Sequence, residues 1–335
     1  MGQEGNGLAA PSMGAREWLM LVTLAIVWGG SFFFYKITLN GGLPPFLVVL
    51  ARVGLAAMVL NIWLFVRGES LPRSPFVWRD FIVMGIINNV IPFSLIVFGE
   101  QRISGGLASI LNATTPVFTI IVAHFLTKTE RLSGLKLLGI VCGFSGVVII
   151  VGPEAISSSY GRDIFGEIAC LVAAISYAFA GVFGRRFSHM KPMTIATGQI
   201  TASSMILIPI VLIFEHPWSL PIPAIHVWEA VAGLALLSTV VAYILYFRIL
   251  SRAGATNLLL VTFLMPVSAI LLDWGFLGEG ITLHSVVGMA VIGLGLAAID
   301  GRLFAVVKRN RRPLTGLSRL SAEKARNMYD GGEGI

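Results

Sequence analysis

The sequence predicts an all-α polytopic membrane protein with ten transmembrane helices arranged as two inverted five-helix repeats, both termini being cytoplasmic. Composition, apolar windows and an internal repeat support this prediction. Of 335 residues, 56% are hydrophobic and 12% are charged, whereas soluble proteins carry roughly 25% charged residues. A soluble fold of this length has too few polar residues to cover so much apolar surface. We therefore expect the chain to lie in a bilayer.

Ten apolar windows are each long enough to cross the hydrocarbon core, which takes about 20 helical residues. They cover residues 18–38, 45–66, 81–99, 104–126, 134–152, 164–184, 194–214, 228–249, 254–276 and 284–306. The connectors are short and rich in turn residues, as in "NGGLPP" and "GESLPRSPF". Ten spans put both termini on the same side of the membrane.

Basic residues set the orientation, because cytoplasmic loops carry an excess of Lys and Arg. With the N-terminus inside, cytoplasmic segments hold all of the 24 basic residues except Lys36, Arg52, Arg102 and Arg162. One missed span would invert every later loop, so this bias supports the count of ten. We expect the basic tail, residues 307–335, to lie against anionic lipid of the inner leaflet rather than on nucleic acid.

The two halves of the chain resemble each other at an offset of about 150 residues. Pro116, Glu130, Gly139 and Gly146 correspond to Pro266, Glu279, Gly288 and Gly295. Because each half has an odd number of spans, the second half is inserted upside down, which is typical of transporters. The predicted units are a cytoplasmic N-terminal segment (1–17), the two repeats (18–152 and 164–306) and the basic tail.

Short motifs occur in a fixed order along both halves: "WGGSFFFYK" in the first span, Arg52 in the second, "TERL" after the fourth and "LGE" before the tenth. Together they resemble the drug/metabolite transporter superfamily, specifically its EamA-type transporter family, over residues 18–306. The resemblance implies ten helices and movement of small metabolites, often amino acids or related compounds moved outward. The superfamily also includes nucleotide-sugar and triose-phosphate carriers, so the resemblance does not identify the substrate.

The first span contains candidate substrate contacts beside small residues. Gly29, Gly30 and Ser31 permit a close helix crossing, because small residues let backbones approach one another in lipid. Trp28 and Ser31 lie about 60° apart around the helix axis, so both are candidates to line a cavity. A packing seam without ligand contact is the alternative.

Polar side chains inside a span need partners, because lipid offers no hydrogen bonds. Asn88 and Asn89, at the centre of the third span, are expected either to contact substrate or to bond a neighbouring helix. Arg52, two turns inside the second span, either binds a substrate carboxylate or reaches nearby carbonyl groups and the interface. The same reasoning extends to Asn112, Gln199 and Thr239.

Tyr177 and Tyr243 occupy corresponding regions of the sixth and eighth spans. Each combines an apolar ring with a hydroxyl group, which suits an amphipathic metabolite, and core packing is the alternative. Near the outer helix ends, Lys36 is expected to extend to the interface. Glu167 and Asp273 are expected to be interfacial.

Several further residues are assigned structural roles. Prolines are expected to kink spans, acidic residues to stabilise helix starts and small residues to pack helices closely. The set comprises Pro116 and Pro266, Glu130 and Glu279, the bundle residues His124, Cys142 and Cys170, and the pairs Gly139/Gly143 and Gly293/Ala297. These pairs suit tight packing of the fifth and tenth spans, with packing between protomers as a further option.

The predicted function is that of a secondary transporter in the inner (plasma) membrane that exports a small metabolite, an amino acid or related amine, by alternating access. The predicted substrate-binding residues are Trp28, Ser31, Asn88, Asn89, Tyr177 and Tyr243. Helices one, three, four, six, eight and nine are expected to enclose them, with the other helices bracing. No cofactor, metal ion, catalytic residue or nucleic-acid partner is expected, and a homodimer is left open. The alternatives are an intramembrane lipid-handling enzyme and a non-transporting membrane scaffold.

Overall fold

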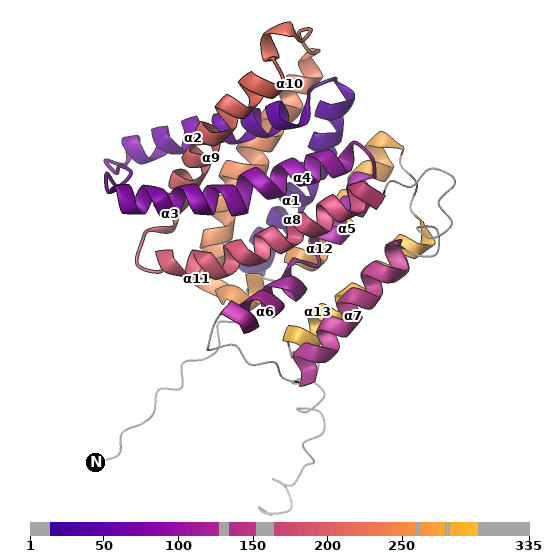
Figure 1. The fold of residues 1–335 in the computed structure, drawn as a ribbon. Coiled ribbons are helices and arrows are strands. Elements are labelled where there is room, and N and C mark those ends of the chain that lie inside the picture. Colours follow the sequence, from indigo (N-terminus) through magenta and orange to yellow (C-terminus); the bar gives the residue numbers. More distant parts are fainter. Residues whose placement is uncertain are drawn as a thin grey trace, which may run out of the picture.

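The computed structural model describes residues 14–126, 134–151, 164–258, 261–278, 280 and 282–300. Within these ranges every regular element is a helix, and the helices form a bundle (Figure 1). The predicted all-helical class is therefore confirmed for the described part of the chain. Glu130 and Glu279 lie outside the described residues.

The first half of the chain forms five helical segments, of which the third and fourth are interrupted. They are α1 (Ala15–Asn40); α2 (Pro45–Val66); α3 (Pro75–Gly85) with the π-helix η1 (Ile86–Val90) and α4 (Ile91–Glu100); α5 (Gly105–Asn112) with α6 (Thr115–Leu126); and α7 (Gly134–Val151). Proline lies in the first turn of α2 and α3, where its missing N–H leaves no hydrogen bond unmade.

The second half also forms five helical segments. They are α8 (Ile164–Phe183) with η3 (Gly184–Phe187); α9 (Pro192–Phe214) followed by the short η4 (Pro217–Ser219); α10 (Ile225–Ala232) with the π-helix η5 (Gly233–Val241) and α11 (Ala242–Leu258); α12 (Val261–Leu272) with the π-helix η6 (Asp273–Leu277); and α13 (Leu283–Asp300). The eighth segment, like the third, therefore contains a π-helix in its middle.

Seven of these segments are long and apolar enough to cross a bilayer, and three shorter apolar helices accompany them. The shorter helices are Leu137–Ile149, Leu264–Leu277 and Leu283–Gly295. Large apolar side chains such as Phe65 and Phe125 are 81% and 79% exposed, as expected of a surface covered by lipid. The polytopic membrane class follows, and the count of ten spans stays a prediction.

Two details of the predicted spans are wrong. α11 continues to Leu258, so the ninth span does not begin at residue 254. The expected kink at Pro116 is a break instead: α5 ends at Asn112, and Pro116 lies in the first turn of α6, where a proline is compatible with helical geometry. Pro266 does lie inside α12.

Glycine brings α1 and α12 into backbone contact. A Cβ atom placed on Gly29 would lie 2.7 Å from the carbonyl oxygen of Met265 on α12, closer than side-chain carbons approach. At Gly30 the nearest atom would be 3.7 Å away, an ordinary van der Waals contact. The predicted close crossing is thus confirmed at Gly29, whereas Gly30 has room for a side chain.

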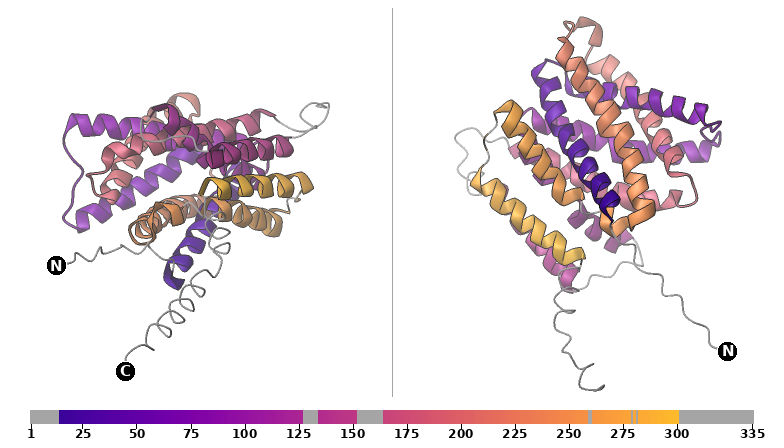
Figure 2. Two further views of the ribbon diagram at one scale, coloured as in Figure 1. Left: turned by 90° about the horizontal axis from the view of Figure 1, so that it is seen from below. Right: turned by 180° about the vertical axis from the view of Figure 1, so that it is seen from behind.

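The helices α7 and α13 lie side by side along one edge of the bundle (Figures 1 and 2). A Cβ on Gly146 would lie 2.8 Å from the Gly288 carbonyl oxygen, and one on Gly295 would lie 2.7 Å from the Gly139 carbonyl oxygen. Tight packing of the fifth and tenth segments is confirmed. This packing joins two helices of one chain, and Gly143 contacts Val117 of α6. Packing between protomers stays a prediction.

Candidate functional site

Arg52 on α2 is the centre of a buried polar cluster. Arg52 is only 5% exposed. Its guanidinium donates two hydrogen bonds to the same segment, from Nε–H to Thr239 Oγ1 at 2.9 Å and from Nη2–H to the Ser238 carbonyl oxygen at 3.1 Å. A further N–H on Nη1 is donated to the Tyr35 hydroxyl. Carbonyl capping, one of the predicted alternatives for Arg52, is what the structure contains.

Two aromatic rings cover the Arg52 guanidinium. Its central carbon lies 4.0 Å from the Phe93 ring centroid and 5.3 Å from the Tyr35 ring centroid. A cation above an aromatic face is attracted by the ring quadrupole, the more so where water is absent. Among the described residues no carboxylate forms an ion pair with Arg52. Arg52 is therefore a buried cation that makes no direct ion pair with the described carboxylates.

The π-helix η5 supplies two of the three acceptors for Arg52. In η5 the Thr239 hydroxyl donates to the Leu234 carbonyl oxygen, five residues earlier, at 2.9 Å. The Ser238 hydroxyl donates to the Val27 carbonyl oxygen on α1 at 2.8 Å. A π-helical turn disrupts the regular backbone ladder and is frequently found at functional sites. Here it presents a backbone carbonyl to Arg52.

The other interrupted helix contributes an amide cluster through η1. Asn88 Nδ2 donates to Gln199 Oε1 on α9 at 3.1 Å, and Gln199 Nε2 donates to the Tyr243 hydroxyl on α11 at 3.2 Å. Asn88 Nδ2 is also 3.5 Å from that hydroxyl, at the limit of a hydrogen bond. Ser176 on α8 donates to the Ile87 carbonyl oxygen of η1 at 2.7 Å.

Asn89 faces a different neighbour from Asn88. Its Nδ2 donates to Ser203 Oγ on α9 at 3.1 Å, and the residue is 0% exposed. Asn89 Oδ1 accepts no hydrogen bond from the described residues. A hydrogen bond to a neighbouring helix, one of the two alternatives predicted for these asparagines, is thus present at both positions.

The remaining predicted site residues are more scattered. The Tyr177 ring is 6.5 Å from the Phe93 ring in an edge contact, which puts it one ring away from Arg52. Trp28 packs on Tyr246 of α11 at 5.7 Å, and Ser31 is buried on α1. The structure brings Asn88 and Tyr243 together, with Tyr177 beside Phe93. Substrate contact by all six predicted residues stays a prediction.

The predicted site omits residues that hold the cluster together. Arg52, Thr239 and Gln199 are not among the six predicted substrate-binding residues, although each is polar and lies inside a span. Tyr35 and Phe93 carry no signal that separates them from other aromatic residues in apolar spans. The charge of Arg52 is the sequence signal that points to this cluster, because an ionisable residue inside a span is by default a candidate functional residue. The second and seventh helices, which were expected only to brace the site, supply Arg52 and Gln199.

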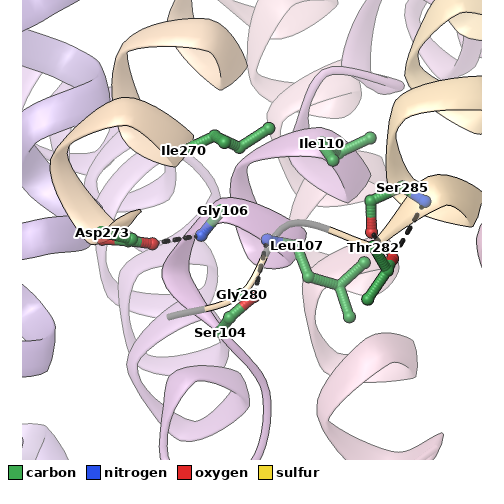
Figure 3. Close-up of a pocket in the computed structure, with 9 residues that line it drawn as sticks. All are labelled: Ser104, Gly106, Leu107, Ile110, Ile270, Asp273, Gly280, Thr282 and Ser285. Atoms are coloured by element: carbon green, nitrogen blue, oxygen red, sulfur yellow. Dashed lines mark hydrogen bonds between the residues drawn. The ribbon is translucent and has the colours of Figure 1, made fainter. Parts of the chain in front are cut away.

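A second polar region lies where the ends of α5, α12 and α13 meet (Figure 3). Asp273 Oδ2 accepts the backbone N–H of Gly106 at 2.5 Å, and the Ser104 hydroxyl accepts that of Leu107 at 3.1 Å. The cavity beside them has a volume of about 20 Å³, which holds about one water molecule. It is too small for a metabolite.

Three charged residues at these helix ends are more buried than predicted. Lys36 Nζ donates to the carbonyl oxygens of Glu100 and Ile103, both at 3.1 Å, so it caps a helix end inside the protein instead of extending to the interface. Glu167 and Asp273 are each 2% exposed, so both carboxylates are buried in the protein, and their depth in the membrane stays a prediction. For Asp273 the backbone N–H of Gly106, in the first turn of α5, stabilises the buried carboxylate.

Comparisons with known proteins agree on one family. A family model described as the EamA-like transporter family matches residues 16–152 and again residues 164–299. "Uncharacterized transporter YoaV" of Bacillus subtilis is 26% identical over 279 residues, covering 83% of this chain and 94% of that protein. "Uncharacterized inner membrane transporter YedA" of Escherichia coli K12 is 27% identical over 294 residues, covering 85% and 91%.

One more relative and one solved structure are also similar to this chain. "Protein PecM" of Dickeya dadantii is 26% identical over 291 residues, covering 84% of this chain and 92% of that protein. A solved structure titled "Crystal structure of protein" superposes with a TM-score of 0.61 at 21% identity, covering 84% of this chain and 96% of that one. At this identity the superposition supports the fold alone.

Proposed function

This chain belongs to the EamA-like transporter family, and we propose that it is a secondary transporter that exports an amino acid or a related amine by alternating access. Family membership makes it a membrane transporter; the substrate, the direction and the mechanism are the proposal. The observation that carries it is the buried Arg52 guanidinium, which has no carboxylate partner among the described residues.

The free donors of Arg52 suit a carboxylate. A guanidinium has five N–H groups, and three of them are donated to Thr239, Ser238 and Tyr35. One N–H remains on each terminal nitrogen. A carboxylate is the group that Arg pairs with most strongly through two parallel hydrogen bonds. The nearby rings and amides offer an ammonium group cation–π contacts and carbonyl oxygens, so both ends of an amino acid have partners.

We propose ten spans in two inverted repeats, as the sequence predicts. The family model matches the two halves separately. The first segment packs on the ninth through α1 and α12, and the sixth packs on the fourth through α8 and α6. Exchanging the two halves converts one of these pairs into the other. Corresponding segments also pair with each other, as α2 does with α9 and α7 with α13.

The cluster has the position expected of a transport site in such a repeat. Arg52 and Asn88 come from the first half, whereas Gln199, Thr239 and Tyr243 come from the second. The π-helices η1 and η5 interrupt the third and eighth segments, which correspond. Transporters with inverted repeats bind substrate near the midplane, between the repeats and at interrupted helices. This agreement supports a site shared by both halves.

We further propose that the protein lies in the inner (plasma) membrane with both termini in the cytoplasm and the basic tail against anionic lipid. The distribution of Lys and Arg supports this orientation. One relative is itself named an inner membrane transporter.

Counterflow into sealed vesicles tests the proposal. Purified protein is reconstituted in liposomes loaded with one unlabelled amino acid, and entry of the labelled compound is measured across a panel of amino acids and amines, with and without a pH gradient. A transporter of this class gives transient accumulation for part of the panel. Chemical conversion of a panel member would favour the enzyme, and silence across the panel would favour the scaffold.

A double substitution, Asn88→Ala with Asn89→Ala, tests the site. We expect counterflow to fall while the protein still inserts and keeps its helical content. Unchanged counterflow in this variant would remove these two residues from the site.

A further inference from the structure

A groove with a volume of about 380 Å³ lies at the end of α1 away from the N-terminus. Its floor is formed by Phe33, Phe34 and Ile37 of α1, and its sides by α10 and by η6. Binding sites for small molecules commonly have volumes of about 300–1,000 Å³ and a mainly apolar lining with a few polar groups. The groove meets both criteria. In the proposed orientation it opens at the outer leaflet, away from the Arg52 cluster.

Three phenylalanine rings form a continuous aromatic surface in the groove. The Phe33 centroid is 5.5 Å from that of Phe34 and 5.7 Å from that of Phe276, the latter in an edge contact. Phe34 is held in place by Gly233, where a Cβ atom would lie 2.6 Å from the ring. Adjacent rings present several electron-rich faces to one ligand, and such faces attract cations.

Glu229 adds a negative charge to this aromatic surface. It lies on α10 and is exposed in the groove, one turn after His226. Among the described residues it has no ion pair and no hydrogen bond. A carboxylate beside apolar rings is complementary to a ligand that joins a positive charge to an apolar body. An anion or a neutral apolar compound would leave this charge uncompensated.

We propose that this groove binds a small amphipathic organic ammonium ion, with its apolar body on Phe33, Phe34 and Phe276 and its nitrogen directed toward Glu229. The proposed occupant is a small molecule, because the groove volume of about 380 Å³ lies in the range of small-molecule binding sites; a lipid headgroup is the alternative that the lipid composition test below addresses. The site is separate from the proposed transport site and does not depend on the identity of the transported metabolite.

Equilibrium binding of radiolabelled benzyltrimethylammonium to the full-length protein in phosphatidylglycerol nanodiscs tests this site. We expect saturable binding that unlabelled benzyltrimethylammonium displaces. Neopentylbenzene, the neutral compound of the same shape, should fail to displace it. Equal displacement by the neutral compound would show that charge plays no part and would overturn the proposal.

Substitutions localise the binding. Glu229→Gln should weaken affinity about tenfold, the effect of removing one favourable charge contact, and Phe276→Leu should weaken it by a smaller factor. Glu17→Gln, which removes a carboxylate from the first turn at the other end of α1, is the matched control and should leave affinity unchanged. Equal affinities for wild type, Glu229→Gln and Phe276→Leu would overturn the site.

The lipid composition of the nanodisc separates a small-molecule site from a lipid site. Affinity should be the same in nanodiscs in which half of the phosphatidylglycerol is replaced by phosphatidylethanolamine and in nanodiscs in which half is replaced by uncharged diglucosyl-diacylglycerol, because the two have equal surface charge. A severalfold lower affinity with phosphatidylethanolamine would mean that the ethanolamine headgroup occupies the groove, which would overturn the choice of a small-molecule ligand.

Discussion

At the scale of single residues, Arg52 shows how a charge is kept inside a membrane protein. Placing an arginine at the centre of a span costs about 2.5–3.5 kcal/mol on insertion scales. Each hydrogen bond to a charged group contributes about 1.5–3 kcal/mol net, and Arg52 makes three. These bonds and the Phe93 contact offset the insertion cost. The protein alone therefore holds the Arg52 guanidinium in one orientation.

Arg52→Lys is expected to reduce transport of an amino acid about tenfold or more, because an ammonium group cannot reproduce the planar donor set of arginine. Transport of the corresponding decarboxylated amine should change much less. Counterflow of the two compounds by wild type and variant gives the ratio. A loss of the same size for both compounds would contradict carboxylate binding and leave Arg52 with a structural role.

At the scale of helices, contacts at helix ends and at glycines decide how segments meet. Glu215, just after α9, accepts the backbone N–H groups of Phe46 at 2.8 Å and Leu47 at 2.6 Å. One carboxylate thus ties the end of α9 to the first turn of α2, where orphan N–H groups need acceptors. Gly29 joins two other helices by a different means, because its missing side chain lets the backbones of α1 and α12 come into contact.

The contact at Glu215 is expected to depend on pH. Burial raises the pKa of Glu215, and the two backbone N–H groups lower it by a smaller amount. Because the folded protein then holds the proton more tightly than the unfolded chain, the contribution is full below the ordinary pKa of glutamate and declines as pH rises through the raised value. Melting of wild type and Glu215→Gln between pH 4 and pH 8 should show the wild-type advantage shrinking with pH. An advantage that grows with pH would reverse this sign.

Gly29→Ala is expected to destabilise the protein by about 1–3 kcal/mol, the usual cost of overpacking. The added Cβ would lie 2.7 Å from a backbone oxygen of α12, which cannot rotate away. Gly30→Ala is the matched control, because its nearest neighbour is 3.7 Å away. Thermal unfolding in nanodiscs should separate the two variants. Equal melting temperatures would mean that the α1–α12 contact adjusts freely.

At the scale of the whole molecule, the bundle joins two halves across shared contacts. The Arg52–Thr239 and Asn88–Gln199 hydrogen bonds link residues 187 and 111 positions apart. Rocking of one half against the other would have to break or rearrange such bonds. In the proposed alternating-access mechanism, the cluster would therefore link substrate contact to the relative position of the two halves.

Accessibility labelling tests the inverted arrangement directly. Single cysteines replace Glu130 or Glu279 in a background without Cys142 and Cys170, and intact cells receive a membrane-impermeant thiol reagent. Position 279 should be labelled in intact cells, and position 130 only after permeabilisation. Labelling of both positions from the same side would rule out inverted repeats.

Much of the fold follows from sequence, whereas only part of the site does. Hydropathy and turn residues located the helical segments, because lipid requires every backbone group of a span to bond within its own helix. The interruptions within the segments do not follow from the sequence. No local residue pattern shows that the helix ends at Asn112 instead of continuing through a kink at Pro116. The predicted site residues Asn88 and Tyr243 meet in one polar cluster, and their contact with substrate stays a prediction. Arg52 is not in the predicted site, because its hydrogen-bond partners lie on segments distant in sequence.

The sequence by itself determined the class of protein, the order of its apolar segments and the family to which it belongs, since each depends on local composition and on the succession of motifs. Tertiary structure alone decided which polar groups meet, that Glu167 and Asp273 are buried, and that Asn88 and Asn89 face different partners. The physical reason is that a side chain inside lipid must bond to whatever the neighbouring helix presents. That neighbour is set by packing between segments more than a hundred residues apart.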